Sequence, residues 1–333
     1  MAHQRSDTTK PCSREVAAGW SRNAPTGRTL TPVMIGIDWG TSSARAFRLA
    51  RDGAVLERRE TPLGILRVPP GGFAEALQGL AGDWIAAGED RVLLAGMVGS
   101  RQGWLEAPYL PCPAGIDALA GALVPVPFQG ASVRLVPGLS AEDGSRVPEV
   151  MRGEEVQVMG ALGDAGPDAL MCLPGSHAKW VRVEGGRIAR FETSMTGEAF
   201  AALRAHTILG RMMEGEAEPG PAFDAGAARA SEPGGLLHHL FGARTLALFG
   251  RLAPADGPSY LSGLLIGHDV AANLPESAPG SDFGGGRVHL VGSGPLMALY
   301  ARAIERRGDA AVPGDADAAA RGLALVGERA SWV

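Results

Sequence analysis

Two polar turns carry the residue types that can bind a phosphate group. Each turn directly follows a short apolar run that predicts a buried strand. Glycine lets backbone N–H groups approach an anion closely, and hydroxyl side chains add further donors. Taken alone, the first turn is explained equally well as the polar bend of a β-hairpin. The candidate phosphate-binding residues are Gly40, Thr41 and Ser42 in the first turn and Gly175, Ser176 and His177 in the second.

Charged side chains beside these turns suggest the rest of a phosphate site. Asp38 ends the first strand, where a carboxylate can hold a hydrated Mg²⁺ ion next to a polyphosphate. Lys179 follows the second turn and could place its ammonium on a phosphate, or it could be an ordinary lysine at a strand edge. We expect His177 to act as a hydrogen-bonding turn residue rather than as an acid or base.

An acid pair precedes the second turn, at the start of a predicted helix. Glu154 or Glu155 could be a general base that takes a proton from an attacking hydroxyl. Arg152 beside them would then hold the carboxylate ionised. The alternative is structural, because two acids in a first helical turn favour the helix dipole. Taken alone, the acid pair is better explained by the dipole.

Loops after three other predicted strands supply further candidates. Arg101 is either a solvated loop arginine or a planar fork for a carboxylate or hydroxyl-rich ligand. Trp104 either covers its loop or forms a wall against which a sugar packs. Gly64 allows a bend in another loop. A glycine turn between a strand and a helix suits close approach of a nucleotide, although many such turns use glycine; its residues are Gly292, Ser293 and Gly294.

Alternating strand and helix patterns predict an α/β fold that positions these loops. A helix starting near residue 196 has Thr196 as its expected N-cap. Strands are expected near residues 35–37, 44–49, 54–56, 91–99, 132–136, 169–173, 179–183, 187–191 and 287–291. Helices are expected over 73–87, 114–123, 154–162, 196–213, 221–230, 236–252, 260–274, 296–307 and 315–330.

Composition excludes several classes of protein. The net charge of −5 gives no basic footprint for nucleic acid, and no apolar run approaches the ~20 residues needed to span a membrane. Three widely spaced cysteines suggest neither a disulfide framework nor a zinc site, so we expect a cytoplasmic protein. Residues 1–33 are polar and aperiodic. We predict a disordered tail there or a start at Met34, with a transit peptide as the alternative.

Together the motifs resemble those of the sugar kinase–actin–Hsp70 superfamily, and more narrowly those of the 2-dehydro-3-deoxygalactonokinase family. Gly40 and Gly175 lie 135 positions apart (175 − 40), a spacing that suits duplicated domains. The resemblance covers the chain from Met34 to its end. It rests on the ordered strings IGIDWGTSSARA, MVGSRQGW, PYLPCP, MRGEE, LPGSHAKWV and ETSMTGE.

The resemblance implies two duplicated ribonuclease H-like (actin-like ATPase) domains with an ATP cleft between them. We place them at residues 34–165 and 166–333, with helix 315–330 packing back on the first. Gly153-Glu154 matches the Gly-Asp of glycerol-kinase-like relatives in position, which favours Glu154 as the base over Glu155. The implied ATP contacts are both turns, Lys179 and residues 292–294, with Asp38 facing Mg²⁺. The implied substrate contacts are Gly64, Ser100, Arg101, Trp104 and Arg152.

The implied activity is phosphoryl transfer from ATP to the 6-hydroxyl of 2-dehydro-3-deoxy-D-galactonate. Alternatives are a related kinase acting on the C4 epimer, 2-dehydro-3-deoxygluconate, or on a neutral sugar. A nucleotide-binding module of the actin or Hsp70 type and an inactive regulatory homologue are further alternatives. We expect a small-molecule sugar acid as partner, neither nucleic acid nor membrane, and the sequence is compatible with a homo-oligomer.

Overall fold

The computed structural model describes residues 32–51, 53–274 and 286–332, and they form a mixed α/β fold. The first sheet contains β1 (Pro32–Trp39), β2 (Ala44–Ala50), β3 (Val55–Thr61), β4 (Arg91–Ala95), β6 (Val124–Val126) and β7 (Ser132–Leu135). The second contains β10 (Ala169–Leu173), β11 (Ala178–Glu184), β12 (Arg187–Ser194), β13 (Arg287–Leu290) and β14 (Ala310–Pro313). A small third sheet contains β5 (Tyr109–Pro111), β8 (Gly138–Glu142) and β9 (Pro148–Met151).

The two larger sheets share one strand order. In the first, β3, β2 and β1 are antiparallel neighbours, and β4 and β7 then run parallel to β1. In the second, β12, β11 and β10 are antiparallel neighbours, and β13 and β14 then run parallel to β10. The first sheet adds β6 as an antiparallel edge strand. Strands β1 and β10 therefore occupy equivalent positions, and they end at equivalent places in their sheets.

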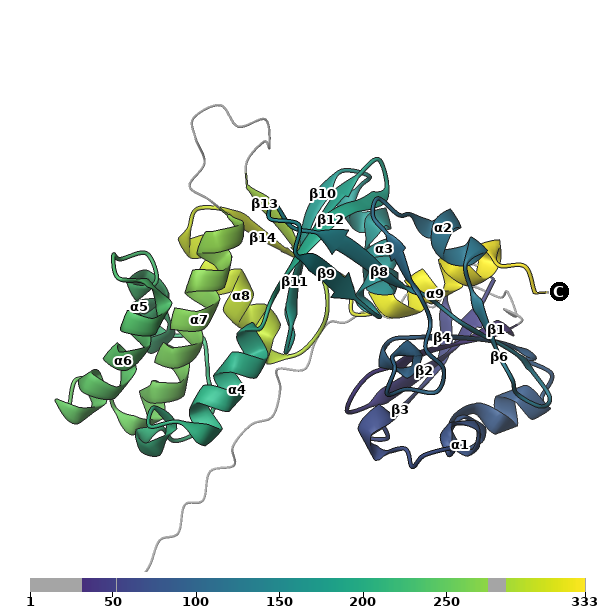
Figure 1. Cartoon of the computed structure of the whole chain (residues 1–333), viewed down its shortest axis with the longest axis horizontal. Helices are drawn as coiled ribbons and strands as arrows, with labels where there is room; N and C mark the ends of the chain where they lie inside the picture. Colours follow the sequence, from purple (N-terminus) through teal and green to yellow (C-terminus); the bar gives the residue numbers. More distant parts are fainter. Residues whose placement is uncertain (1–31, 52, 275–285, 333) are drawn as a thin grey trace, which may run out of the picture. The chain divides into compact units, whose positions relative to one another are not determined.

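Helices cover the sheets (Figure 1). On the first sheet, β1 alternates between two cores, so Ile35 and Ile37 pack toward α1 while Met34 packs toward α9. On the second sheet, Cys172 and Trp180 share a core with α7 and α8. The helices are α1 (Phe73–Ala86), α2 (Ile116–Gly121), α3 (Glu154–Ala165), α4 (Thr196–His206), α5 (Pro221–Arg229), α6 (Gly235–Leu248), α7 (Gly257–Asn273), α8 (Pro295–Arg306) and α9 (Ala318–Arg329).

Helices α3 and α9 cross very closely, because glycines meet backbone at the crossing. A Cβ at Gly160 would lie 1.9 Å from the Ala318 carbonyl oxygen, and one at Gly322 would lie 1.9 Å from the Val156 carbonyl oxygen. Arg321 secures the pair, since its Nε donates to the Gly160 carbonyl oxygen at 3.0 Å. Helix α9 also contacts β1, β2 and β4. The start of α3 is thereby fixed against the first sheet.

Most predicted elements are present with shifted ends, and some expectations were wrong. Strand β1 begins at Pro32, so the predicted tail loses two residues, while residues 1–31 lie outside the described part of the chain. Helix α4 ends at His206 rather than near Met213, and a separate 3₁₀ turn covers Gly210–Met212. Across the described ranges, no helix is both long and apolar enough to cross a bilayer.

Candidate active site

Turn 1, residues 40–43, connects β1 to β2 and leaves its backbone open. Gly40 N–H donates to the Ser43 carbonyl oxygen at 2.9 Å, which closes the turn. A Cβ at Gly40 would meet nothing nearer than 3.5 Å, so space remains beside the glycine. Thr41 and Ser42 are exposed. The predicted phosphate-binding groups of this turn are therefore accessible to a ligand.

A loop from the same sheet braces turn 1 from behind. The N–H groups of Gly64 and Ile65 donate to the carbonyl oxygens of Ser42 and Gly40, at 3.2 and 3.0 Å. A Cβ at Gly64 would lie 2.3 Å from the Thr41 carbonyl oxygen. The structure gives Gly64 a packing role beneath turn 1, and its predicted contact with substrate stays a prediction. This close approach explains why a glycine is needed there.

Asp38 lies at the end of β1 with its carboxylate paired to Arg45 on β2 at 2.5 Å. Burial raises the pKa of Asp38, while the Arg45 guanidinium lowers it. The described residues contain no group of three or more His, Cys, Asp or Glu side chains that could hold a metal. A single carboxylate suits Mg²⁺, which commonly keeps several waters and takes its other ligands from phosphate. The donor set therefore fits a hydrated Mg²⁺ ion and not a cation enclosed by protein.

Turn 2, residues 174–177, connects β10 to β11 and is also open. A Cβ at Gly175 would have its nearest neighbour at 3.9 Å, and Ser176 and His177 are exposed. The start of α4 braces this turn, since Glu198 N–H donates to the Ser176 carbonyl oxygen at 3.0 Å. The His177 ring also pairs with the Glu198 carboxylate. This contact agrees with the expectation that His177 is a hydrogen-bonding turn residue.

Lys179 links turn 2 to the acid pair. Its side chain is buried, and Nζ lies 3.2 Å from Glu154 Oε1 and 3.1 Å from the His177 carbonyl oxygen. The ammonium expected on a phosphate thus already has a carboxylate partner. Lys179 comes from β11 and Glu154 from the start of α3, so the contact joins the second sheet to the helix that crosses α9.

The two glutamates of the acid pair differ sharply in environment. The Glu154 side chain keeps 25% of its exposure, and its Oε2 accepts from Arg152 N–H at 3.0 Å. Glu155 is fully buried, with Oε2 accepting from Gly153 N–H at 2.7 Å. Burial, followed by the Glu154 charge, raises the pKa of Glu155 to about 8. Only Glu154 combines a charge partner with access to a ligand.

Close contacts of Gly96 and Gly153 place Asp38, at the end of β1, beside the start of α3. A Cβ at Gly96, which follows β4 at φ 94°, would lie 3.2 Å from Asp38 Oδ1. A Cβ at Gly153 would lie 3.0 Å from the Gly96 Cα atom. The Glu154 charge also acts on Asp38, raising its pKa. Asp38, Glu154 and Lys179 therefore form one charged cluster.

Arg152 does not have the role predicted for it beside the acid pair. Its Nη2 donates to the Ala107 carbonyl oxygen at 2.8 Å, and its guanidinium lies over the Tyr109 ring at 4.3 Å from the centroid. Within the described residues it forms no ion pair with Glu154 or Glu155, and its charge is a minor influence that lowers the pKa of Glu155. Lys179, not Arg152, is the cation that contacts Glu154.

The predicted substrate loop separates into buried and exposed residues. Ser100 Oγ is buried without a hydrogen-bond partner. The Arg101 side chain is 86% exposed and reaches Glu106 only at 3.5 Å. Trp104 stacks on Phe73 with ring centroids 6.1 Å apart and packs on the core beneath α1. This packing fits the predicted hydrophobic cover, and the predicted contact of Trp104 with a sugar stays a prediction.

The glycine turn at residues 292–294 lies between β13 and α8 as predicted. Gly292 and Gly294 adopt positive φ angles of 136° and 93°, and Ser293 and Gly294 are exposed. A Cβ at Gly294 would meet nothing within 4 Å. Because β13 is the parallel neighbour of β10, this turn and turn 2 leave the same edge of the second sheet. Both can face one ligand there.

Asp269 on α7 organises the second sheet and was missed from the sequence. Its buried carboxylate accepts from Trp180 Nε1 and Thr196 Oγ1, both at 3.0 Å, and from the Tyr300 hydroxyl. Burial, with the Asp269 charge, raises the pKa of Tyr300. Thr196 therefore does not cap α4: the N-cap is Met195 and lacks a side-chain cap. An isolated aspartate inside an apolar helix was the only signal in the sequence.

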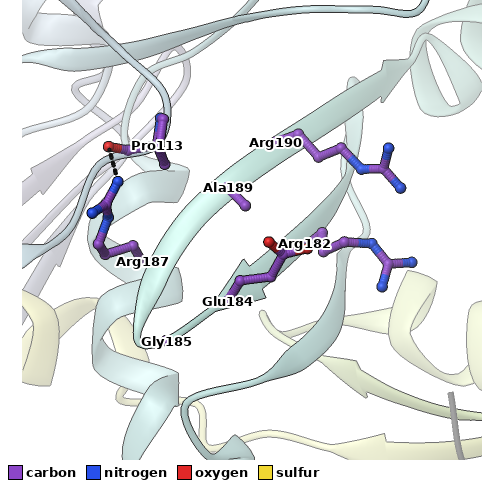
Figure 2. A pocket seen from close by; sticks show the side chains of 7 residues that line it. All are labelled: Pro113, Arg182, Glu184, Gly185, Arg187, Ala189 and Arg190. Carbon is purple, nitrogen blue, oxygen red and sulfur yellow. Dashed lines mark hydrogen bonds between the residues drawn. The ribbon is translucent and has the colours of Figure 1, made fainter. Parts of the chain in front are cut away.

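A cavity of about 700 Å³ lies elsewhere, on the β11–β12 hairpin (Figure 2). Arg187 Nη2 donates to the Pro113 carbonyl oxygen at 3.2 Å at one side of it. Arg182 and Arg190 face each other across the two strands. None of the predicted site residues lines this cavity, so it is separate from the charged cluster.

Comparison with known proteins gives a consistent result. The sequence model of the family described as 2-keto-3-deoxy-galactonokinase matches residues 38–326. A probable 2-dehydro-3-deoxygalactonokinase of Rhizobium meliloti (strain 1021) is 39% identical over 301 residues, covering 89% of this chain and 96% of that protein. The 2-dehydro-3-deoxygalactonokinase of Escherichia coli (strain K12) is 34% identical over 279 residues, covering 84% and 91%.

A solved structure is similar over the same extent. It is a crystal structure from Sinorhizobium meliloti, provisionally assigned as a 2-dehydro-3-deoxygalactonokinase. It superposes with a TM-score of 0.80 at 38% sequence identity and covers 88% of this chain and 97% of its own. Sequence and fold thus agree on the same group of relatives.

Proposed function

The chain belongs to the 2-keto-3-deoxy-galactonokinase family, and on that premise we propose that it transfers a phosphoryl group from ATP to the 6-hydroxyl of 2-dehydro-3-deoxy-D-galactonate. The observation that carries the proposal is the contact between Lys179 and Glu154. It brings turn 2 and the accessible Glu154 carboxylate together, near Asp38, which precedes turn 1 at the end of β1. A kinase needs these parts: donors for phosphates, an acid near the metal and a base near the acceptor hydroxyl.

We assign the architecture to two duplicated actin-like domains, residues 34–165 and 166–333, with ATP held between them. The shared strand order of the two larger sheets supports duplication. The equivalent positions of turn 1 and turn 2 support phosphate contacts from both sides. The turn at residues 292–294 is the proposed contact for the nucleoside, since its open glycines leave room for one.

Glu154 is the proposed general base. Its carboxylate is held by Lys179 and by Arg152 N–H while remaining partly exposed, as a base that reaches a substrate hydroxyl must be. Glu155 is a poor candidate, because it is fully buried and its pKa of about 8 keeps it protonated at neutral pH. Its hydrogen bond with Gly153 N–H gives it a structural role at the start of α3.

The two turns orient and neutralise the phosphates. Both glycine turns are open, so backbone N–H groups there can donate to anionic oxygens. Gly40 N–H is not among these donors, because it already donates to the Ser43 carbonyl oxygen. The hydroxyl groups of Thr41, Ser42 and Ser176 add donors from exposed positions. A Mg²⁺ ion held through water at Asp38 would neutralise further charge on the phosphate oxygens. In this arrangement positioning and electrostatics contribute most of the rate enhancement.

A substrate panel tests the proposed function. ADP formation would be measured with 2-dehydro-3-deoxy-D-galactonate, its C4 epimer and neutral hexoses, each with and without Mg²⁺. We expect a sugar acid to give the highest kcat/KM and expect little ADP without sugar. Faster turnover of a neutral sugar would contradict the assigned substrate. Slow ATP hydrolysis that no sugar accelerates would instead favour a nucleotide-binding module.

A further inference from the structure

Arg152 is a buried cation whose hydrogen bonds are incomplete. The residue is only 6% exposed, and its single acceptor in the described part of the chain is the Ala107 carbonyl oxygen. Its Nε and Nη1 atoms are buried without a hydrogen-bond partner. Tyr109 covers one face of the guanidinium at 4.3 Å. A guanidinium has five N–H donors, so most of its binding capacity is unused.

The charge of Arg152 also lacks a counter-ion. Among the described residues, no carboxylate oxygen lies within 4.0 Å of its guanidinium nitrogen atoms, and Glu154 accepts only from the backbone N–H of Arg152. Glu155 is the acid that acts on it electrostatically, and Glu155 is protonated below about pH 8. A buried charge without a partner is strongly unfavourable. The arrangement therefore favours an anion that arrives from outside the chain.

The surroundings of Arg152 mark where such an anion would bind. Gly99 lies against the guanidinium, and a Cβ there would be 3.1 Å from Arg152 Nη1. The next residue, Ser100, has a buried hydroxyl that also lacks a partner. The unpaired donors of Arg152, between β9 and α3, and of Ser100, in the loop after β4, thus lie close to each other. Donors of this kind suit a carboxylate, which guanidinium groups bind in a planar, often bidentate geometry.

Arg152 and Glu154 point to different neighbours although one residue separates them. Arg152 reaches Ala107 and Tyr109, while Glu154 reaches Lys179. Gly153 between them has φ 109°, a left-handed conformation that redirects the chain. A ligand with an anionic group at one end and a hydroxyl at the other could therefore contact both side chains.

We infer that Arg152, stacked on Tyr109, receives the carboxylate of the sugar acid while Glu154 faces the hydroxyl at the opposite end. This inference rests on the proposed kinase function and adds the residue that selects an acid over a neutral sugar. The sequence-based expectation placed both Arg101 and Arg152 at the substrate. We assign the carboxylate to Arg152, because the exposed Arg101 side chain already has Glu106 nearby. A buried arginine discriminates better, because water does not compete for its donors.

The test compares the sugar acid with its carboxamide, which removes the charge and keeps the shape. For the unmodified protein we expect kcat/KM to favour the acid by about 10²-fold or more, as for a truncated charged pair. In Arg152→Gln the acid should lose about 10²-fold while the carboxamide changes little, so the preference collapses. Most of the loss should be in KM, because the carboxylate lies far from the reacting hydroxyl. Arg152→Lys should restore part of the preference through its charge alone.

Two further variants and one binding measurement make the result decisive. Arg190→Gln removes an exposed arginine outside the charged cluster and should leave the preference unchanged. Arg101→Gln tests the rival directly: collapse of the preference there, with Arg152→Gln unaffected, would overturn the inference. ATP affinity measured by calorimetry should match in all variants, which excludes misfolding. If the unmodified protein phosphorylates neither acid nor carboxamide, the proposed function fails; if it does and Arg152→Gln keeps the preference, only this inference fails.

Discussion

Turn 1 and turn 2 occupy equivalent places in two sheets of the same strand order, yet their charges are connected differently. Each hairpin has a cation near the start of its second strand, Arg45 on β2 and Lys179 on β11. Arg45 pairs with Asp38 inside its own hairpin, whereas Lys179 pairs with Glu154 on another element. The same framework thus gives one self-contained turn and one that is coupled to the proposed base.

The backbone supports of the two turns differ in a similar way. Turn 1 rests on a loop that follows β3 of its own sheet, where Gly64 packs beneath it. Turn 2 rests on the start of α4, which is tied to α7 through Thr196 and Asp269. A movement of α4 or α7 would therefore shift turn 2. We therefore expect changes at turn 2 to affect turnover and changes at turn 1 to affect mainly local order and nucleotide binding.

Replacing Glu154 gives the largest expected effect and breaks the link between turn 2 and the base. Glu154→Gln should lower kcat by about 10²–10⁴-fold, because a glutamine cannot accept the hydroxyl proton. ATP affinity should change far less, which calorimetry with a non-hydrolysable analogue would measure. Near-normal turnover in this variant would exclude Glu154 as the base. Glu155→Gln is the matched comparison, and we expect it to retain most of the activity.

The two hairpin cations provide the next test, as a matched pair. Lys179→Met leaves the Glu154 carboxylate without its partner, so kcat should fall about 10–10²-fold. Arg45→Met removes a partly exposed partner of Asp38. Because Arg45 lowers the pKa of Asp38, its loss should mainly weaken Mg²⁺ binding, with a smaller change in kcat at saturating metal. Steady-state kinetics over a range of Mg²⁺ concentrations would separate the two. Equal effects on kcat would contradict the proposal that only the hairpin of Lys179 is coupled to the base.

A pair of glycine substitutions separates the packing that supports turn 1 from the proposed binding of ATP by turn 1. Gly64→Ala places a Cβ 2.3 Å from backbone, so we expect a loss of about 1–3 kcal/mol in the free energy of unfolding. Gly40→Ala meets no neighbour within 3.4 Å. It should keep its thermal stability and instead lose ATP affinity, because the methyl group faces the open side of the turn. Denaturant unfolding and nucleotide titration of both variants would check this; a strongly destabilised Gly40→Ala would contradict it.

The smallest effect concerns pH and the structural acid Glu155. Its folded pKa of about 8 lies above the ordinary value of 4.5, so the folded chain holds a proton that the unfolded chain releases. This contribution to stability is therefore largest at low pH and declines as pH rises from about 4.5 to 8. Glu155→Gln should flatten the decline of the melting temperature over that window. An unchanged pH profile would mean that Glu155 is ionised in the folded state.

Local sequence patterns predicted the turns and most elements well. Short apolar runs followed by Gly and hydroxyl residues located both turns, because a hairpin is specified by neighbouring residues. Apolar spacing placed α5, α7 and α8 within about three residues of their observed ends. The small sheet of β5, β8 and β9 was not predicted, since its strands are three to five residues long and find partners through non-local pairing.

Side-chain partners across the fold were the harder part. Thr196 looked like a cap because the sequence does not reveal that Asp269, 73 positions away, competes for its hydroxyl. Arg152 looked like a partner for its neighbours in sequence, but Gly153 turns the chain and Ala107 lies 45 positions away. Lys179 was predicted to contact a phosphate or to be a strand-edge lysine, because the sequence does not reveal that Glu154 lies beside its ammonium. Residue type identified the candidates, and only tertiary contacts decided their roles.

The crossing of α3 and α9 has a consequence for the order of folding. Arg321 and Gly160 are joined across 161 positions, and α9 also packs on β1 near the other end of the described chain. Contacts so distant in sequence form late, since loop closure must come first. On a ribosome, α3 and the Glu154 it carries would lack their support until the last helix has emerged. A nascent chain should therefore be unable to phosphorylate sugar before synthesis of α9 is complete.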